Sequence, residues 1–237
     1  SQRSTAENME LLFQTALKKY QKGDLKQAVH LCLQLLKVDK NHFKTLDFLG
    51  SLYALIGNNE QAVFYLAQAV RIHPDHVIAL NNLGLVLCHL GRFNDSERYL
   101  REAVRLEPNF AEAHNNLGFA LQETNSIAES KKCYLTAVRL KPDYPEALNN
   151  LGVIHRYQQR PVAAIIAFKK AIELQPDYAR AYYNLSCTKG YKLTEPERKK
   201  IAALLEESEQ VSDITSLCSS LYLYYFDKKR YHNAFAY

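Results

Sequence analysis

The sequence lacks any long apolar run. No stretch of its 237 residues approaches the roughly 20 consecutive apolar residues of a membrane-spanning helix. Residues 1–8 are polar and hold no apolar signal-peptide core, so we expect a leader or tag remnant there. The net charge of +5 is spread without a long basic run, which ordinary solvated helix faces explain. We therefore expect neither a membrane nor a nucleic acid as partner.

Paired cysteines are also absent. The number of cysteines is odd, their spacing is wide, and none forms a CxxC pair, which argues against a disulfide framework or a zinc site. The pattern predicts a reducing, cytoplasmic environment, with the cysteines as small packing residues. The five are Cys32, Cys88, Cys133, Cys187 and Cys218.

Motifs of catalysis are missing as well. The sequence has no glycine-rich phosphate loop, no HExxH and no nucleophile elbow. His73 and His76 flank a turn, but two ligands without a third make a poor metal cage. His114 and His155 fall at expected core positions, where packed histidines are the simpler interpretation. We predict no catalytic residue, no metal and no cofactor, and a chain that is not itself an enzyme.

The sequence does contain a period of 34 residues. Three columns of small or helix-breaking residues share it, so one supersecondary unit is copied along the chain. The columns are Gly50, Gly84, Gly118 and Gly152; Ala69, Ala103, Ala137 and Ala171; and Pro74, Pro108, Pro142 and Pro176. The register predicts copies at 9–42, 43–76, 77–110, 111–144 and 145–178, with a sixth from Ala179.

Each copy has apolar residues at helical spacing in two stretches separated by a turn. The turn carries glycine in the first three copies, and Asn125 and Gln159 replace it in the next two. The proline near each copy's end closes the second helix. The recurring glycine of the first helix faces small residues of the second, which predicts close helix contact. These small residues are Ala28, Ala62, Ser96, Ser130 and Ala164, and the core leucines beside the glycines are Leu49, Leu83, Leu117, Leu151 and Leu185.

The last fifth of the chain departs from the strict period. Thr194 to Glu197 read as a capping box that opens a helix running to about Glu209, within an irregular sixth unit at 179–214. A seventh copy is expected at 215–237, with a second helix from about Tyr231. Because that copy would be truncated, we expect the chain to be a fragment of a longer protein.

The repeat resembles the tetratricopeptide repeat family, most plainly at Leu80-Asn-Asn-Leu-Gly84, Gly91, Ala103 and Pro108. The resemblance covers nearly the whole chain, although the first copy has Thr15-Ala16 for Leu-Gly and Lys40 for proline. It implies an all-α, right-handed superhelical solenoid of antiparallel helix pairs, in which the first helices line a concave groove.

In that register, asparagines recur at one inner position. An amide offers donors and an acceptor, so a row of them can hold a peptide backbone whatever its side chains. The row resembles the asparagine ladder of the O-GlcNAc transferase repeat region; the alternative is that asparagine before Leu-Gly is simply common in the family. The inner asparagines are Asn82, Asn116, Asn150 and Asn184, preceded by Asn81, Asn115 and Asn149 in three copies.

Further inner positions complete the candidate peptide-binding site. Leu85, Phe119 and Val153 form an apolar stripe beside the amides, and Arg156 and Tyr183 lie farther along. The carboxylate clamp of chaperone-binding relatives would need asparagine at Leu85 and Phe119, so we do not predict that ligand.

The sequence leads to one main functional hypothesis and two others. The main one is a non-catalytic protein–protein interaction scaffold that binds an extended or helical peptide segment in its concave groove. The alternative is the substrate-recognition arm of a larger glycosyltransferase-type or sulfotransferase-type enzyme, because residues 194–237 resemble the junction before such domains. A third possibility is a homo-oligomer assembled through the terminal repeats.

Overall fold

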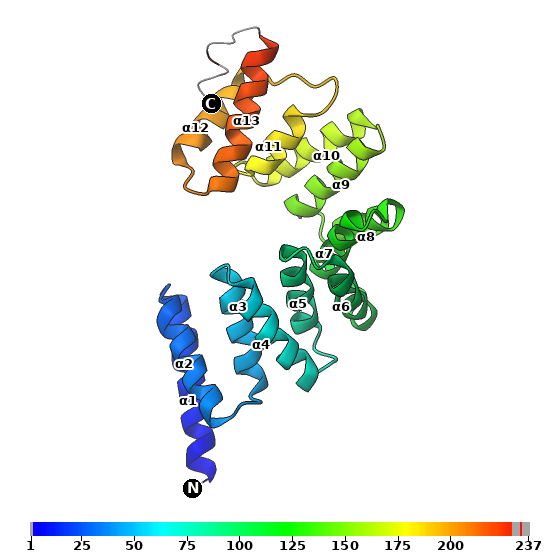
Figure 1. Cartoon of the computed structure of the whole chain (residues 1–237). Helices are drawn as coiled ribbons and strands as arrows, with labels where there is room; N and C mark the ends of the chain where they lie inside the picture. Colours follow the sequence, from blue (N-terminus) through cyan, green and yellow to red (C-terminus); the bar gives the residue numbers. More distant parts are fainter. Residues whose placement is uncertain (1, 229–232, 234–237) are drawn as a thin grey trace. The chain divides into compact units, whose positions relative to one another are not determined.

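The computed structural model describes residues 2–228 and residue 233, and all the regular structure of that part of the chain is helical. The predicted all-α fold of antiparallel helix pairs is confirmed. The chain divides into two compact units, residues 1–126 and residues 127–237 (Figure 1). The boundary falls inside the predicted fourth copy, between its two helices.

The first unit contains seven helices, and consecutive helices pack against each other (Figure 1). The first helices of neighbouring copies are also in contact: α3 packs on α5, and α5 packs on α7. The helices are α1 (Gln2–Gln21), α2 (Leu25–Val38), α3 (Phe43–Leu55), α4 (Asn59–Ile72), α5 (Val77–His89), α6 (Phe93–Leu106) and α7 (Ala111–Glu123). Helix α1 thus begins at Gln2, within the segment expected to precede the first copy.

The second unit contains the other six helices of the described chain. Helix α9 packs on α8 and α10, and α11 packs on α9, α10, α12 and α13. The helices are α8 (Ile127–Leu140), α9 (Pro145–Tyr157), α10 (Pro161–Leu174), α11 (Ala179–Ser186), α12 (Glu195–Glu207) and α13 (Val211–Asp227).

The turns inside the copies have the left-handed backbone that their residues favour. Gly57 has φ +85°, and the equivalent Asn125 and Gln159 have φ 62° and 54°. Glycine adopts this conformation freely, asparagine tolerates it, and glutamine does so at a cost. The chain therefore makes the same turn in all five copies, including the two without glycine.

Close helix contact explains the glycine column. A Cβ atom on Gly84 would lie 2.5 Å from Cγ of Leu100, and one on Gly152 would lie 2.6 Å from Cε1 of Phe168. The facing small residues of the second helices are fully buried, and Ser96 donates a 2.7 Å hydrogen bond from Oγ to the carbonyl of Gly84. The core leucines expected beside the glycines are all buried.

The irregular C-terminal part keeps its predicted capping box. The backbone N–H of Glu197 donates to Thr194 Oγ1, and the N–H of Thr194 donates to the Glu197 carboxylate. Helix α12 ends at Glu207, slightly before the expected Glu209. Helix α13 begins at Val211 rather than near Thr215, and its buried residues, from Leu217 on, pack against α11 and α12. The second helix expected from Tyr231 lies outside the described residues.

The cysteines are all free, and three of them are buried as predicted. Cys218 is half-buried, whereas Cys187 is exposed, so the packing interpretation is wrong for Cys187. Over the described residues, no helix combines the length and apolar character needed to cross a membrane.

Candidate binding face

The asparagines lie on the first helices of the copies: α5 and α7 in the first unit, α9 and α11 in the second. They fall into two groups by burial. Asn82 and Asn150 are half-buried. The others are buried, with exposed fractions of 9% or less: Asn81, Asn115, Asn116, Asn149 and Asn184.

The buried asparagines bond to one another between copies. In the first unit, Asn116 donates from Nδ2 to Oδ1 of Asn81 over 2.9 Å. In the second unit, Asn184 donates in the same way to Asn149, also over 2.9 Å. Each bond joins the second asparagine position of one copy to the first asparagine of the copy before it. Some of the hydrogen-bonding groups of these amides therefore hold neighbouring first helices together.

The hydrogen bonding differs at the N-terminal end of the row of asparagines. Asn82 donates from Nδ2 to Ser51 Oγ over 3.4 Å, and the position that matches Asn81 one copy earlier is Asp47. Oδ1 of Asp47 is buried and has no hydrogen-bond partner among the described residues. Burial raises the pKa of this carboxyl, and the nearby His76 partly offsets the rise.

The predicted apolar stripe lies beside the asparagines. Leu85, Phe119 and Val153 sit one helical turn after Asn82, Asn116 and Asn150, and all three are half-buried. This arrangement places amides and partly exposed apolar groups on one side of each first helix. Each of the two units carries its own part of this set, and we call these parts, with Arg156 and Tyr183 in the second unit, the asparagine face.

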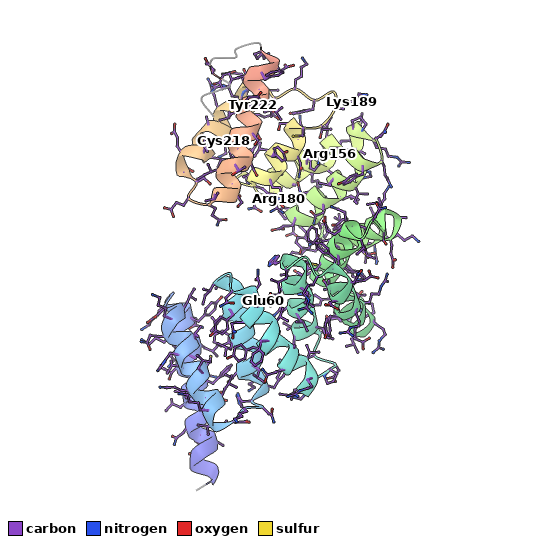
Figure 2. The ribbon with its side chains drawn as sticks, in the orientation of Figure 1. Glu60, Arg156, Arg180, Lys189, Cys218 and Tyr222 are labelled. Carbon is purple, nitrogen blue, oxygen red and sulfur yellow. The ribbon has the colours of Figure 1, made fainter. Side chains whose placement is uncertain are left out.

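Arg156 and Tyr183 line two different pockets of the second unit. Arg156 donates from Nη1 to the carbonyl of Asn184 over 3.4 Å and borders a pocket of about 550 Å³ that also contains Lys189 (Figure 2). Tyr183 is 37% exposed and borders a pocket of about 590 Å³. Cys218 and Tyr222, which also line this pocket, lie on α13 (Figure 2). The first pocket can receive an anionic group and the second an apolar one.

Three of the candidate histidines contact an aromatic ring or hydrogen-bond to the backbone. The ring of Phe43 lies edge-on to His73 and His76, with centroids 4.5 and 4.7 Å away, and His76 Nδ1 accepts the N–H of Ala79 as the N-cap of α5. His114 is half-buried and its Nε2 lies 2.9 Å from the carbonyl of Pro108. Within the described residues, no group of three or more His, Cys, Asp or Glu side chains could hold a metal ion.

Burial lowers the pKa of His155, and the positive charges of Lys131 and Arg160 lower it further. The side chain is half-buried, and its Nδ1 atom is buried without a hydrogen-bond partner among the described residues. Burial and the two nearby cations thus disfavour the charged form of this ring.

One surface feature escaped the sequence interpretation. Between the second helices α2 and α4, a groove of about 450 Å³ is lined by Leu33, Leu36, Leu46, Phe64 and Tyr65, with basic residues at its edge. We call it the aromatic groove. The signal in the sequence was Phe64-Tyr65 in the middle of an amphipathic helix, where one of two adjacent aromatics must face outward.

Helix pairs repeated at a fixed interval define a helical-repeat protein, the class that serves in protein–protein interaction. Models described as tetratricopeptide repeat match residues 43–76, 78–106, 111–144 and 145–178, more than half of the chain. The chain belongs to the tetratricopeptide repeat family. Comparison of the sequence with curated proteins found no match.

Solved structures share the fold. PilW, described as a widely conserved type IV pilus biogenesis factor, has a TM-score of 0.71 at 21% identity, over 87% of this chain and 98% of PilW. PilF of Pseudomonas aeruginosa has a TM-score of 0.69 at 18% identity, over 98% of this chain and 99% of PilF. YrrB, described as a TPR protein with an unusual peptide-binding site, has a TM-score of 0.60 at 24% identity, over 72% of this chain and 88% of YrrB.

Proposed function

We propose that this chain is an interaction scaffold whose asparagine face binds an extended segment of a partner protein. The observation that carries the proposal is the pair of 2.9 Å bonds, Asn116 to Asn81 and Asn184 to Asn149. Each bond ties the first helix that carries Asn82 or Asn150 to the first helix of the next copy, so less conformational freedom is lost when a ligand binds. The peptide-binding site described for YrrB, a protein of the same fold, adds support.

The division by burial assigns different roles along the face. The half-buried Asn82 and Asn150 would contact the ligand backbone, while the buried asparagines would hold the first helices in register. Leu85, Phe119 and Val153 would contact apolar side chains of the ligand. In the second unit, an acidic ligand group would fit near Arg156 and Lys189, and an apolar one near Tyr183.

The test begins with selection of peptides from a random displayed library against the full chain. Affinities are then compared for the wild type and for Asn82→Ala with Asn150→Ala, which keeps both 2.9 Å bonds. We expect about a thirtyfold loss of affinity, because a backbone hydrogen bond is worth about 1 kcal/mol and the loss of two costs about 2 kcal/mol. The matched control is Asn94→Ala with Asn109→Ala, two exposed asparagines outside the face.

Two results would count against this site. If no peptide is selected, the chain does not bind extended segments, and if the selected peptides bind both double variants equally, they bind elsewhere. Circular dichroism must show the same helicity for all variants. The cytoplasmic location and an oligomer through the terminal repeats stay predictions; sedimentation of the chain over a concentration series tests the latter.

The recognition-arm alternative has one supporting feature, the capped helix α12 that replaces the regular repeat after α11. In that case the same face would position substrates for a transferase domain encoded with it. The test is to express the longest protein that contains this sequence and assay sulfuryl and glycosyl transfer. If the double variant Asn82→Ala with Asn150→Ala retains the transfer activity, the enzyme does not use the proposed face.

A further inference from the structure

The aromatic groove contains an aromatic side chain that the fold leaves in water. Phe64 on α4 is 56% exposed, and its ring meets that of Tyr65 edge-on with centroids 5.0 Å apart. Tyr65 is held from behind by stacking on Tyr53 at 5.6 Å. The floor of the groove includes Leu46, which is buried. A concave apolar surface with a fixed aromatic wall is a typical docking feature.

The edge of the groove is basic. Its basic residues are His30, Lys37 and Lys40, and none of the described residues that line it is Asp or Glu. Lys37 and Lys40 are both exposed. Asp39 stands between them in sequence but is half-buried and accepts a 2.9 Å hydrogen bond from the N–H of Asn41. The charge around the apolar floor is therefore complementary to an acidic partner.

The repeat itself does not require this surface. One copy later, between α4 and α6, the position of Phe64 is taken by Arg98 and that of Gln68 by Glu102. Arg98 lies over the ring of Tyr99 at 4.7 Å, and Glu102 pairs with Arg105 at 2.6 Å. The same place in the next copy is thus occupied by an arginine stacked on a tyrosine and by an ion pair instead of an open apolar wall.

We propose that the aromatic groove binds an acidic amphipathic helix of a partner protein. Its apolar side chains would lie between α2 and α4 against Phe64 and Tyr65, and its carboxylates would face Lys37 and Lys40. The site lies mainly on the second helices α2 and α4, with Leu46 of α3 in its floor, and contains no residue of the asparagine face.

The experiment measures fluorescence anisotropy of a labelled synthetic helix against the full chain. The probe has about 14 residues, roughly four helical turns, with Leu and Phe along one side and Glu on the other. A matched probe carries Lys in place of every Glu. We expect the Glu probe to bind at least about tenfold more tightly than the Lys probe, with an affinity that falls as salt is added.

Substitutions then locate the site. Lys37→Glu with Lys40→Glu should weaken the Glu probe at least about tenfold, because attraction becomes repulsion. Phe64→Ser should weaken it as well, and this exposed position is compatible with folding. The control Lys22→Glu with Lys26→Glu makes the same charge change at two exposed lysines that do not line the groove.

Three outcomes would overturn the proposal. They are equal binding of the Glu and Lys probes, equal effects of the two lysine double variants, and unchanged binding by Phe64→Ser. If only the double variant Asn82→Ala with Asn150→Ala loses binding of the Glu probe, the probe binds to the asparagine face instead. If instead the library peptides fail to bind while the Glu probe behaves as expected, only the proposed function fails.

Discussion

Single side chains distinguish copies that share one backbone. The column of Asn81, Asn115 and Asn149 is buried, and in the first unit Asn81 accepts a bond from the next copy. At the matching position of α3 stands Asp47, whose Oδ1 has no hydrogen-bond partner among the described residues. A carboxylate there is a poor substitute for an amide, since burial penalises its charge.

Replacement of Asp47 by asparagine should therefore stabilise the protein at neutral pH. Burial raises the pKa of Asp47 above its ordinary 3.8, against the effect of His76, so the folded state disfavours ionisation. Wild-type stability from this group is then lost as the pH rises above that value. We expect a higher melting temperature for Asp47→Asn at about pH 7, with a difference that shrinks toward about pH 4. Thermal unfolding followed by circular dichroism at several pH values measures it.

The exposed Asp75→Asn serves as the control for this prediction and should change little. A lower melting temperature for Asp47→Asn at neutral pH would show that the carboxylate has a stabilising role that burial does not reveal.

Pairs of helices are held together by shape as well as by apolar area. The contact of α5 with α6 requires that Gly84 have no side chain, because Leu100 lies against it and is fully buried. The serine at position 96 fills the facing small position and bonds back to the glycine carbonyl. The same geometry recurs at Gly50 with Leu66 and at Gly152 with Phe168, so one packing rule serves both units.

Gly84→Ala should accordingly destabilise the protein by about 1–3 kcal/mol through overpacking. Alanine gains about 1 kcal/mol in helix propensity, but a Cβ atom 2.5 Å from Leu100 Cγ forces the core to shift, and we expect that cost to prevail. Denaturant unfolding measures the difference.

The companion change is Leu100→Ala, which makes room for the new methyl group. The double variant should be less destabilised than the sum of the two single changes, with a coupling of about 0.5–3 kcal/mol. Simple additivity would mean that the two residues do not meet as the geometry indicates.

Across the chain, stability should be local, since repeats pack on their neighbours in sequence. Each of the two compact units has its own buried cluster, around Leu80 and Leu83 in one and around Ile201 and Leu221 in the other. In an array of this kind, the free energy of unfolding is approximately the sum of the stabilities of the single repeats and of the interfaces between neighbouring repeats.

Hydrogen exchange on Gly84→Ala tests this locality. We expect the largest loss of protection in α5 and α6, a smaller loss in α4 and α7, and none in α12 and α13, because the strain is placed at one helix pair. A uniform loss over all the described helices would instead show one cooperative structure. The wild-type chain under the same conditions provides the reference.

The sequence alone determined the periodic part of this protein. Glycine, alanine and proline columns predicted the helices and their turns, because close packing and helix termination restrict those positions to a few residue types. The capping box at Thr194 could also be predicted from the sequence, because it consists of hydrogen bonds between side chains and backbone groups three residues apart.

Only the tertiary structure decided how the polar and apolar side chains are used. The sequence predicted an unbroken row of ligand-facing amides, whereas packing buries Asn116 and Asn184 and bonds them to the copy before. The adjacent Phe64 and Tyr65 indicated one outward aromatic, but only the structure shows that Phe64 is the exposed one and that the equivalent Arg98 stacks on an aromatic ring. Such differences depend on which side chains meet between neighbouring copies, and a repeat of 34 residues fixes where helices lie without fixing those partners.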